Sequence, residues 1–308
     1  MMVADLLRFA SPEWSALEEG GVLTSQYGAY LSLKTQDEGT LTLTFAKHYP
    51  NLVWTVTIDG EKSEELLVVA DHVSVHLQAG HYYQLTLDQW ATGQVDFWRT
   101  GLVLADLTWS GDEELLPVLP KDGEATKPYL TFVGDSIVAG EAMAGPNHDR
   151  HQPALSFPAL VANHFDRPLN RIAYGGTGLT ARAPFQEPKA IDALWQVGEG
   201  ISRRRVVTDR VIVAYGLNDA NYGASDQEFA FGLRVYLLEL VKRFHGADFY
   251  LLTPWNGAFV DIVLAEVARF SNFTVVRADQ WGIQTRPYHP DVLAHQKIAE
   301  QLVAVLEE

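Results

Sequence analysis

The stretch Tyr129-Leu-Thr-Phe-Val-Gly-Asp-Ser-Ile137 decides how the rest of the chain is interpreted. It begins as an uncharged run rich in β-branched and aromatic residues, which is typical of a buried strand. The strand pattern stops at Gly134, and the residues after Ile137 are compatible with a helix. Ser136 is therefore predicted at the carboxyl end of a strand, where ligands bind in open α/β sheets. Because Asp135 and Ser136 are also common helix caps, a purely structural role stays open at this point.

The chain alternates between strands and helices from Tyr129 to its C-terminus. Strand patterns lie at 169–174, 206–215, 248–253 and 273–276, and helix patterns lie at 155–165, 227–244, 260–270 and 290–307. An alternation of this kind predicts a three-layer α/β/α domain with a mostly parallel sheet.

The first 120 residues have instead the pattern of an all-β domain. Short alternating segments lie at 41–45, 53–58, 73–77, 82–87 and 95–98. This spacing predicts a β-sandwich of the jelly-roll kind at 1–120, a linker at 121–128 and the α/β domain at 129–308. The tryptophans of the β domain either fill its core or form a surface on which sugars stack, and both interpretations stay open for Trp54, Trp90, Trp98 and Trp109.

The composition excludes several classes of protein. The chain has no apolar run of the roughly 18 residues that a membrane-spanning helix needs. Its formal net charge of −16 opposes binding to nucleic acid or to an anionic membrane, because both need a basic surface. The N-terminus lacks the pattern of a secretory signal peptide, which predicts a cytoplasmic location. The absence of cysteine rules out disulfides, a thiol nucleophile and thiolate metal ligands.

Four segments are expected to bring polar or glycine-rich groups to one edge of the predicted sheet, since the carboxyl ends of parallel strands meet there. They are Gly134-Asp-Ser136, Gly175-Gly-Thr-Gly178, Gly216-Leu-Asn-Asp219 and Tyr288-His-Pro290. A serine, a histidine, a glycine-turn N–H and an asparagine amide are sufficient for acyl transfer. The serine attacks a carbonyl, the histidine takes and returns the proton, and the two donors hold the oxyanion.

These four blocks resemble those of the SGNH, or GDSL-type, hydrolase superfamily. Its blocks are Gly-Asp-Ser, a glycine turn, Gly-x-Asn-Asp and a histidine near the C-terminus, in the order found here. The resemblance covers the chain from Tyr129 onward, and it implies that Ser136 is the nucleophile and His289 the general base and acid. It also implies an oxyanion hole made of the Ser136 and Gly176 backbone N–H groups and the Asn218 side chain.

One position departs from the superfamily pattern. An acidic residue usually stands three positions before the catalytic histidine, and Arg286 occupies that position here. A backbone carbonyl or a distant carboxylate such as Asp279 would then orient His289, or the enzyme would be impaired. We expect the carbonyl, and therefore a Ser-His dyad, because Asp291 follows the histidine instead of preceding it. His295 is a rival for the catalytic role, but it is expected as a surface residue of the last helix.

A jelly roll followed by an SGNH domain with a weakened third member is similar to carbohydrate esterase family two. That resemblance implies a serine esterase that removes acetyl groups from acetylated oligosaccharides, with no metal and no organic cofactor. It makes Trp255, just beyond a predicted strand, a candidate for contact with the sugar, unless this ring packs beneath a loop. Two alternatives remain, a general short-chain acyl esterase of the GDSL lipase kind and a catalytically inactive carbohydrate-binding protein.

Overall fold

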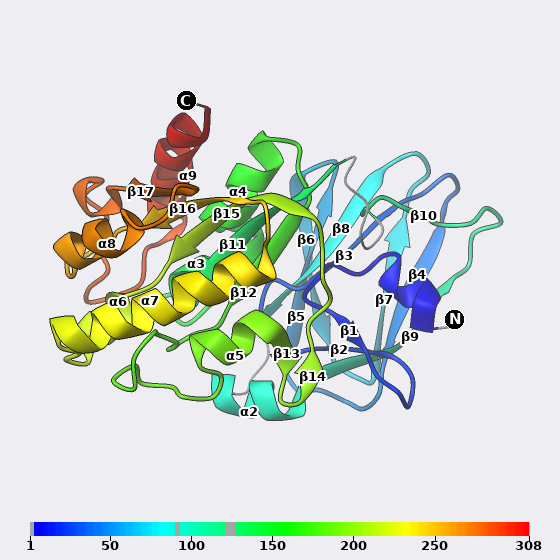
Figure 1. Ribbon diagram of the computed structural model, residues 1–308. Helices are drawn as coiled ribbons and strands as arrows, with labels where there is room; N and C mark the ends of the chain where they lie inside the picture. The colour runs from blue at the N-terminus through cyan, green and yellow to red at the C-terminus, as the bar shows by residue number, and fades with distance from the viewer. Residues whose placement is uncertain (1–2, 90–92, 121–126, 308) are drawn as a thin grey trace. The chain divides into compact units, whose positions relative to one another are not determined.

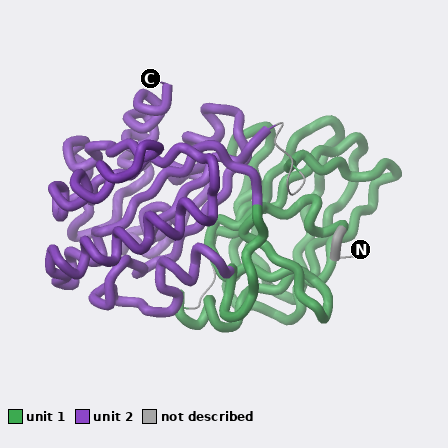
Figure 2. Tube along the Cα trace, viewed as in Figure 1, with its two compact units in different colours: residues 1–123, 197–205 green, residues 124–196, 206–308 purple. Residues whose placement is uncertain are grey.

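The computed structural model describes residues 3–89, 93–120 and 127–307. The chain divides into two compact units, which Figure 2 colours separately. The first unit is residues 1–123 with 197–205, and the second is 124–196 with 206–308. Most of the predicted linker, 121–126, lies outside the described residues, so the boundaries predicted at 120 and 129 stay predictions.

The first unit consists of two antiparallel sheets. One sheet has the strand order β1-β2-β9-β4-β7, and the other has the order β10-β3-β8-β5-β6. The strands are β1 (Ser15–Ala16), β2 (Val22–Thr24), β3 (Tyr30–Lys34), β4 (Gly39–Phe45), β5 (Leu52–Ile58), β6 (Glu61–Val68), β7 (His72–Leu77), β8 (Tyr82–Gln89), β9 (Leu102–Trp109) and β10 (Leu116–Pro117). Two helices, α1 (Val3–Leu7) and α2 (Gln94–Thr100), complete this part of the chain. Apolar side chains from both sheets form one buried core.

The sequence pattern is confirmed for the segments at 41–45, 53–58, 73–77 and 82–87, which lie in strands β4, β5, β7 and β8. The strand predicted at 95–98 is wrong, because this segment belongs to helix α2. Its buried side chains are Gln94, Phe97 and Trp98, and this spacing of three and four residues is that of a helix face. Four residues are too few for the strand and helix periods to be told apart.

The tryptophans of the β sheets belong mainly to the core. Trp54 is fully buried and stacks on Trp14 with ring centroids 6.2 Å apart, and Trp98 is buried as well. Trp109 is partly buried, and its indole N–H donates to the Glu113 carbonyl. Trp90 lies outside the described residues. The core interpretation is therefore confirmed for Trp54, whereas Trp98 is buried in helix α2 outside the core cluster.

The second unit is built on a five-stranded parallel sheet of order β12-β11-β15-β16-β17. Numbered along the chain from the first of these strands, this is the order 2-1-3-4-5 of doubly wound flavodoxin-like sheets. Its strands are β11 (Tyr129–Gly134), β12 (Leu169–Ala173), β15 (Thr208–Ala214), β16 (Asp248–Leu252) and β17 (Phe273–Val276). Every strand and helix predicted downstream of Tyr129 overlaps an element of the structure.

Helices pack together in two groups around this sheet. Helix α4 contacts α9, whereas α7 contacts both α5 and α8. Figure 1 shows α7 lying across one face of the sheet. The helical segments are α3 (Ser136–Ala139), η1 (Pro153–Leu155), α4 (Phe157–His164), α5 (Ala190–Trp195), α6 (Leu217–Asn221), α7 (Asp226–Arg243), α8 (Val260–Val267), η2 (Ala278–Gln280) and α9 (Val292–Glu307). None of the helices in the described part of the chain has the length and apolarity needed to cross a membrane.

One insertion was not foreseen. The short strands β13 (Gln196–Gly198) and β14 (Ile201–Ser202) interrupt the α/β segment, and residues 197–205 belong to the first unit. The Ser25 hydroxyl donates to the Val197 carbonyl, and the Arg203 guanidinium donates to the Gln26 side chain. Arg203 of the basic cluster at 203–205 is thus engaged by a side chain that lies 177 positions earlier in the sequence.

Candidate active site

The register of the parallel sheet brings three of the predicted blocks to the same edge. Gly134 at the end of β11 pairs with Ala173 of β12 on one side and with Ala214 of β15 on the other. The segments that follow these residues therefore leave the sheet at the same level. In a sheet of this order, successive strands are added on one side of β11 and then on the other, and ligands bind at the switch point between β11 and β15.

Ser136 is the first residue of the short helix α3. Asp135 is its N-cap, because the carboxylate accepts from the Ile137 N–H at 3.1 Å. The predicted capping role is therefore present, and it belongs to the aspartate. A side chain at Gly134 would lie 2.7 Å from the Ala214 carbonyl, so the turn before the serine requires glycine.

The structure brings Ser136 and His289 together from positions 153 residues apart. The serine hydroxyl lies 2.8 Å from Nε2 of the imidazole, which is hydrogen-bonding distance. Burial and the nearby His148 hold the pKa of His289 below its usual 6.5. The imidazole is therefore neutral at physiological pH, and a neutral imidazole can accept the serine proton.

No acidic residue of the described chain is hydrogen-bonded to His289. The carboxylate of Asp279 accepts from Thr253 and Arg277, and the salt bridge with Arg277 lowers the Asp279 pKa to about 2. Asp291 accepts from the Ala294 N–H at the start of α9. Both carboxylates are thus engaged elsewhere.

Arg286, at the position usual for the acid, donates instead to the Asn221 side chain at 2.6 Å. The backbone carbonyl expected to hold the imidazole is likewise not found among the hydrogen bonds of the described residues. A ring contact beside the histidine holds its loop, because Tyr288 stacks on His148 with centroids 4.5 Å apart and planes 6° apart.

The glycine turn after β12 leaves a backbone donor unused. Gly176 has φ +70°, a conformation that favours glycine, and the Phe185 ring occupies the space that a side chain there would need. Within the described chain the N–H groups of Gly176 and Ser136 have no hydrogen-bond acceptor. Free N–H groups of this kind can bind a developing negative charge.

Asn218 lies in helix α6, which begins after Gly216 at φ +111°. Its side-chain amide donates one hydrogen bond to the Thr177 carbonyl at 2.9 Å, which fixes the amide and leaves a second N–H available. The neighbouring Asp219 carboxylate accepts from the backbone N–H groups of Leu179 and Thr180. Asn218 therefore fixes Thr177 within the glycine turn, and Asp219 fixes the two residues that follow the turn.

Trp255 and His295 are both more buried than expected. Trp255 is only 7% exposed, and its ring packs edge-on against Phe157, with centroids 6.2 Å apart, and beside Trp281. His295 is fully buried in α9, and its Nδ1 accepts from the Phe157 N–H at 3.1 Å. His295 is therefore not a surface residue, and among the described residues its ring nitrogens make no contact with Ser136.

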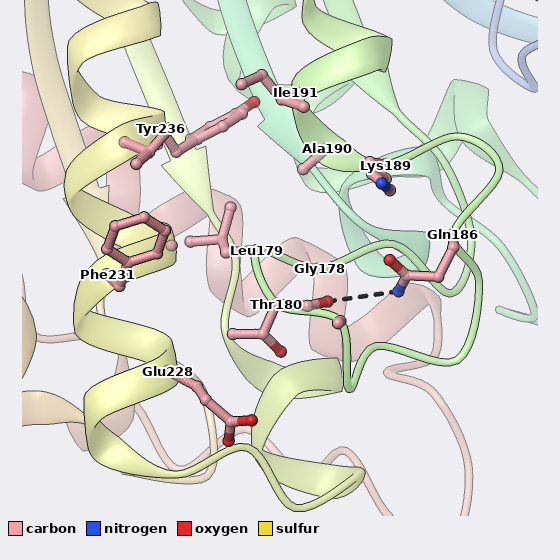
Figure 3. A pocket seen from close by; sticks show the side chains of 13 residues that line it. Gly178, Leu179, Thr180, Gln186, Lys189, Ala190, Ile191, Glu228, Phe231 and Tyr236 are labelled. Atoms are coloured by element: carbon pink, nitrogen blue, oxygen red, sulfur yellow. Dashed lines mark hydrogen bonds between the residues drawn. The ribbon is translucent and has the colours of Figure 1, made fainter.

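A pocket of about 390 Å³ opens beyond the glycine turn, between residues 178–191 and helix α7 (Figure 3). Leu179, Ile191 and Phe231 supply much of its apolar wall. The side chain of Gln186 donates to the Thr180 carbonyl at its edge. This pocket could not be predicted from the sequence, because its walls come from a loop and a helix that are distant along the chain.

The described residues contain no group of three or more His, Asp or Glu side chains spaced to hold a metal ion. The chemistry available at this edge of the sheet is that of a hydroxyl, a neutral imidazole and a set of hydrogen-bond donors. These are the groups that acyl transfer through a serine nucleophile requires.

Solved structures share this fold over nearly the whole chain. A family two carbohydrate esterase from Clostridium thermocellum, solved in complex with cellohexaose, is 20% identical with a TM-score of 0.74, and 97% of each chain is covered. An acetyl xylan esterase from the rumen bacterium Butyrivibrio proteoclasticus is 14% identical with a TM-score of 0.75, covering 100% of this chain and 98% of the other. The chain therefore shares its fold with these carbohydrate esterases and resembles family two structurally.

The same fold also occurs in an enzyme that transfers acyl groups. A salicylyl-acyltransferase from a tetracycline biosynthetic pathway is 18% identical with a TM-score of 0.63, covering 92% of this chain and 84% of the other. The sequence itself matches no protein-family profile and no curated protein.

Proposed function

We propose that the protein is a serine esterase that removes acetyl groups from acetylated carbohydrate. The observation that carries this proposal is the 2.8 Å contact between the Ser136 hydroxyl and Nε2 of His289. Ser136 attacks the ester carbonyl as His289 takes its proton, and His289 then protonates the departing sugar hydroxyl. Water, deprotonated by the same imidazole, hydrolyses the acetyl-serine and regenerates both residues.

The oxyanion of each tetrahedral intermediate is held by three donors in this proposal. They are the free backbone N–H groups of Ser136 and Gly176 and the remaining amide N–H of Asn218. Donors fixed before the reaction need no reorganisation when the charge develops, which is why such groups lower the barrier. The Asn218–Thr177 hydrogen bond supports this assignment because it holds the amide in place.

We assign Ser136 and His289 to a dyad without a carboxylate. The engagement of Asp279 with Arg277 and of Asp291 with the α9 backbone supports this assignment. A carboxylate partner would raise the pKa of the histidine, whereas the His289 pKa is lowered by burial.

The proposed substrate class rests on exposed aromatic side chains beside the site, here called the aromatic rim. The rim consists of Phe185, Tyr222 and Tyr288, which are 40%, 57% and 53% exposed. Phe185 covers Gly176, and Tyr288 precedes His289. The Tyr222 N–H bonds the Asn218 carbonyl. Aromatic rings with one wet face suit the apolar faces of a sugar ring.

Carbohydrate as the substrate is also supported by the cellohexaose complex and the xylan esterase among the similar structures. In the first unit, strands β2-β9-β4-β7 face the set β3-β8-β5-β6, which supports its assignment as a jelly roll. Trp255 stays a proposed sugar contact, although its 7% exposure leaves only an edge of the ring for a ligand.

Replacing a rim residue separates sugar binding from chemistry. In Tyr222→Ala we expect KM for an acetylated xylo-oligosaccharide to rise about fivefold, because a stacking contact is lost. The rate with para-nitrophenyl acetate, which has no sugar, should stay unchanged. The matched control is Leu238→Ala, which removes an exposed apolar side chain of helix α7 that belongs neither to the rim nor to the pocket. An equal loss with both substrates in Tyr222→Ala would argue against the rim.

The pocket beyond the glycine turn favours a second candidate function, that of a general acyl esterase. Its apolar wall begins at Gly178, two residues after Gly176, and would suit an acyl chain longer than acetyl. A preference for butyryl or hexanoyl esters over acetyl esters, lost in Phe231→Ala, would support this candidate. A preference for acetyl esters supports the carbohydrate esterase.

A further inference from the structure

Glu141 is a buried carboxyl group beside the nucleophile to which the proposed mechanism gives no role. It follows Gly140, which ends helix α3, and its backbone N–H donates to the Ser136 carbonyl at 3.0 Å. Its side chain therefore starts from the same turn that carries the nucleophile. Within the described chain its Oε1 atom is buried and has no hydrogen-bond partner.

The Glu141 carboxyl lies against the glycine turn. A Cβ atom built on Gly175 would lie 2.9 Å from Oε1 and closer still to Oε2, so the carboxyl fills the space that a side chain there would occupy. The Gly175 N–H also donates to this carboxyl. Gly175 directly precedes Gly176, whose N–H is the proposed oxyanion donor. The carboxyl thus joins the turn of the nucleophile to the turn of the oxyanion hole.

The charge of this carboxyl matters because it lies so close to the proposed oxyanion hole. A carboxylate there would repel the negative charge that develops during the reaction. A neutral carboxylic acid keeps the same contacts without that repulsion. Burial, together with the neighbouring Asp135 charge, raises the pKa of Glu141 to about 7, so the neutral form is well populated near neutrality.

We propose that Glu141 is a positioning residue of the oxyanion hole, which in its neutral form supports the Gly175–Gly176 turn and in its ionised form opposes the reaction. This inference rests on the proposed esterase function, and it predicts that the esterase activity falls at alkaline pH as Glu141 ionises. Glu141 acts through the glycine turn and need not touch the substrate.

The Asp135 charge acts directly on this carboxyl, His151 bonds the backbone of the next residue, and His289 contacts Ser136. Asp135 is buried as well, and its burial raises its pKa to about 7. His151, whose Nδ1 accepts from the Ala142 N–H, has a pKa lowered to about 4 by burial and stays neutral. His289 is neutral above its lowered pKa and sets the acidic limit of activity.

The test compares Glu141→Gln with the wild type in para-nitrophenyl acetate hydrolysis between about pH 6 and about pH 9. The amide keeps the size of the acid but cannot ionise, so we expect the ratio of variant to wild-type kcat/KM to rise about tenfold over this range. Both proteins should lose activity alike on acidification, because His289 is unchanged. Glu141→Ala should lower kcat about tenfold at about pH 6, where the wild-type side chain is neutral, with little change in KM.

The exposed Glu300→Gln on helix α9 is the matched control and should follow the wild type throughout. A constant ratio of Glu141→Gln to wild type across pH would overturn the proposal. So would full activity of Glu141→Ala.

A second measurement does not depend on activity. Glu141 is ionised in the unfolded chain above its usual pKa of 4.5 but binds its proton more tightly when folded. The wild type should therefore lose stability as pH rises from 4.5 toward 7, and Glu141→Gln should lose less. Parallel Tm-versus-pH curves would contradict the neutral buried acid even if the protein proved not to be an esterase. If Ser136→Ala hydrolysed esters normally while the Tm curves diverged, the esterase proposal would fail and the buried acid would stand.

Discussion

Ser136→Ala is expected to lower kcat for para-nitrophenyl acetate by about 10⁴-fold or more, since the acyl-enzyme can no longer form. The fold should survive, because within the described part of the chain the hydroxyl makes one hydrogen bond, the one to His289. Circular dichroism and Tm of the purified variant would check this point. The measurement is the initial rate at saturating ester, compared with the wild type and corrected for uncatalysed hydrolysis.

Ser271→Ala is the matched control for this variant. Ser271 is an exposed serine between helix α8 and strand β17, and its loss should leave the rate unchanged. Comparable rates in Ser136→Ala and the wild type would remove Ser136 from the mechanism and leave the inactive carbohydrate-binding protein as the leading hypothesis.

Asn218→Ala is expected to lower kcat by about 10²- to 10³-fold while KM changes little, because the lost N–H acts on the transition state more than on the bound ester. Part of this loss in kcat comes from displacement of the glycine turn, since the Asn218 amide also donates to the Thr177 carbonyl. Steady-state kinetics with one small ester would give kcat and KM separately.

Asn221→Ala is the control from the same short helix. Its side chain accepts from Arg286 and takes no part in the proposed oxyanion hole, so this variant should lose less than about threefold. If the two asparagine variants were equally impaired, disruption of helix α6 would explain both, and the oxyanion role of Asn218 would be abandoned.

The arrangement of the candidate active site could be predicted from the sequence, because parallel topology strongly constrains where the ends of the strands lie. A buried strand ending in Gly-Asp-Ser and a later strand ending in Gly-x-Asn-Asp must leave a parallel sheet at the same edge. The Ser136–His289 contact follows from that topology together with the closing helix. The strand predicted at 95–98 failed because a four-residue segment satisfies both strand and helix spacing.

Other features depend on loops that have no periodic pattern. The position of Phe185 over Gly176, and of Glu141 against Gly175, is set by backbone turns that the residue types do not specify. Asp219 was visible as part of the Gly-x-Asn-Asp block, but its bonds to Leu179 and Thr180 needed the folded turn. The insertion of residues 197–205 into the first unit is long-range and likewise left no local signal.

The most direct test of the proposed function is covalent labelling of the nucleophile by diethyl para-nitrophenyl phosphate, followed by peptide mass spectrometry. A serine activated by a neutral histidine attacks phosphorus, releases para-nitrophenol and keeps the diethylphosphoryl group. We expect one such group per chain, on the peptide that contains Ser136, and none in Ser136→Ala. A wild-type protein that stays unlabelled, or that is labelled only at another residue, would contradict it.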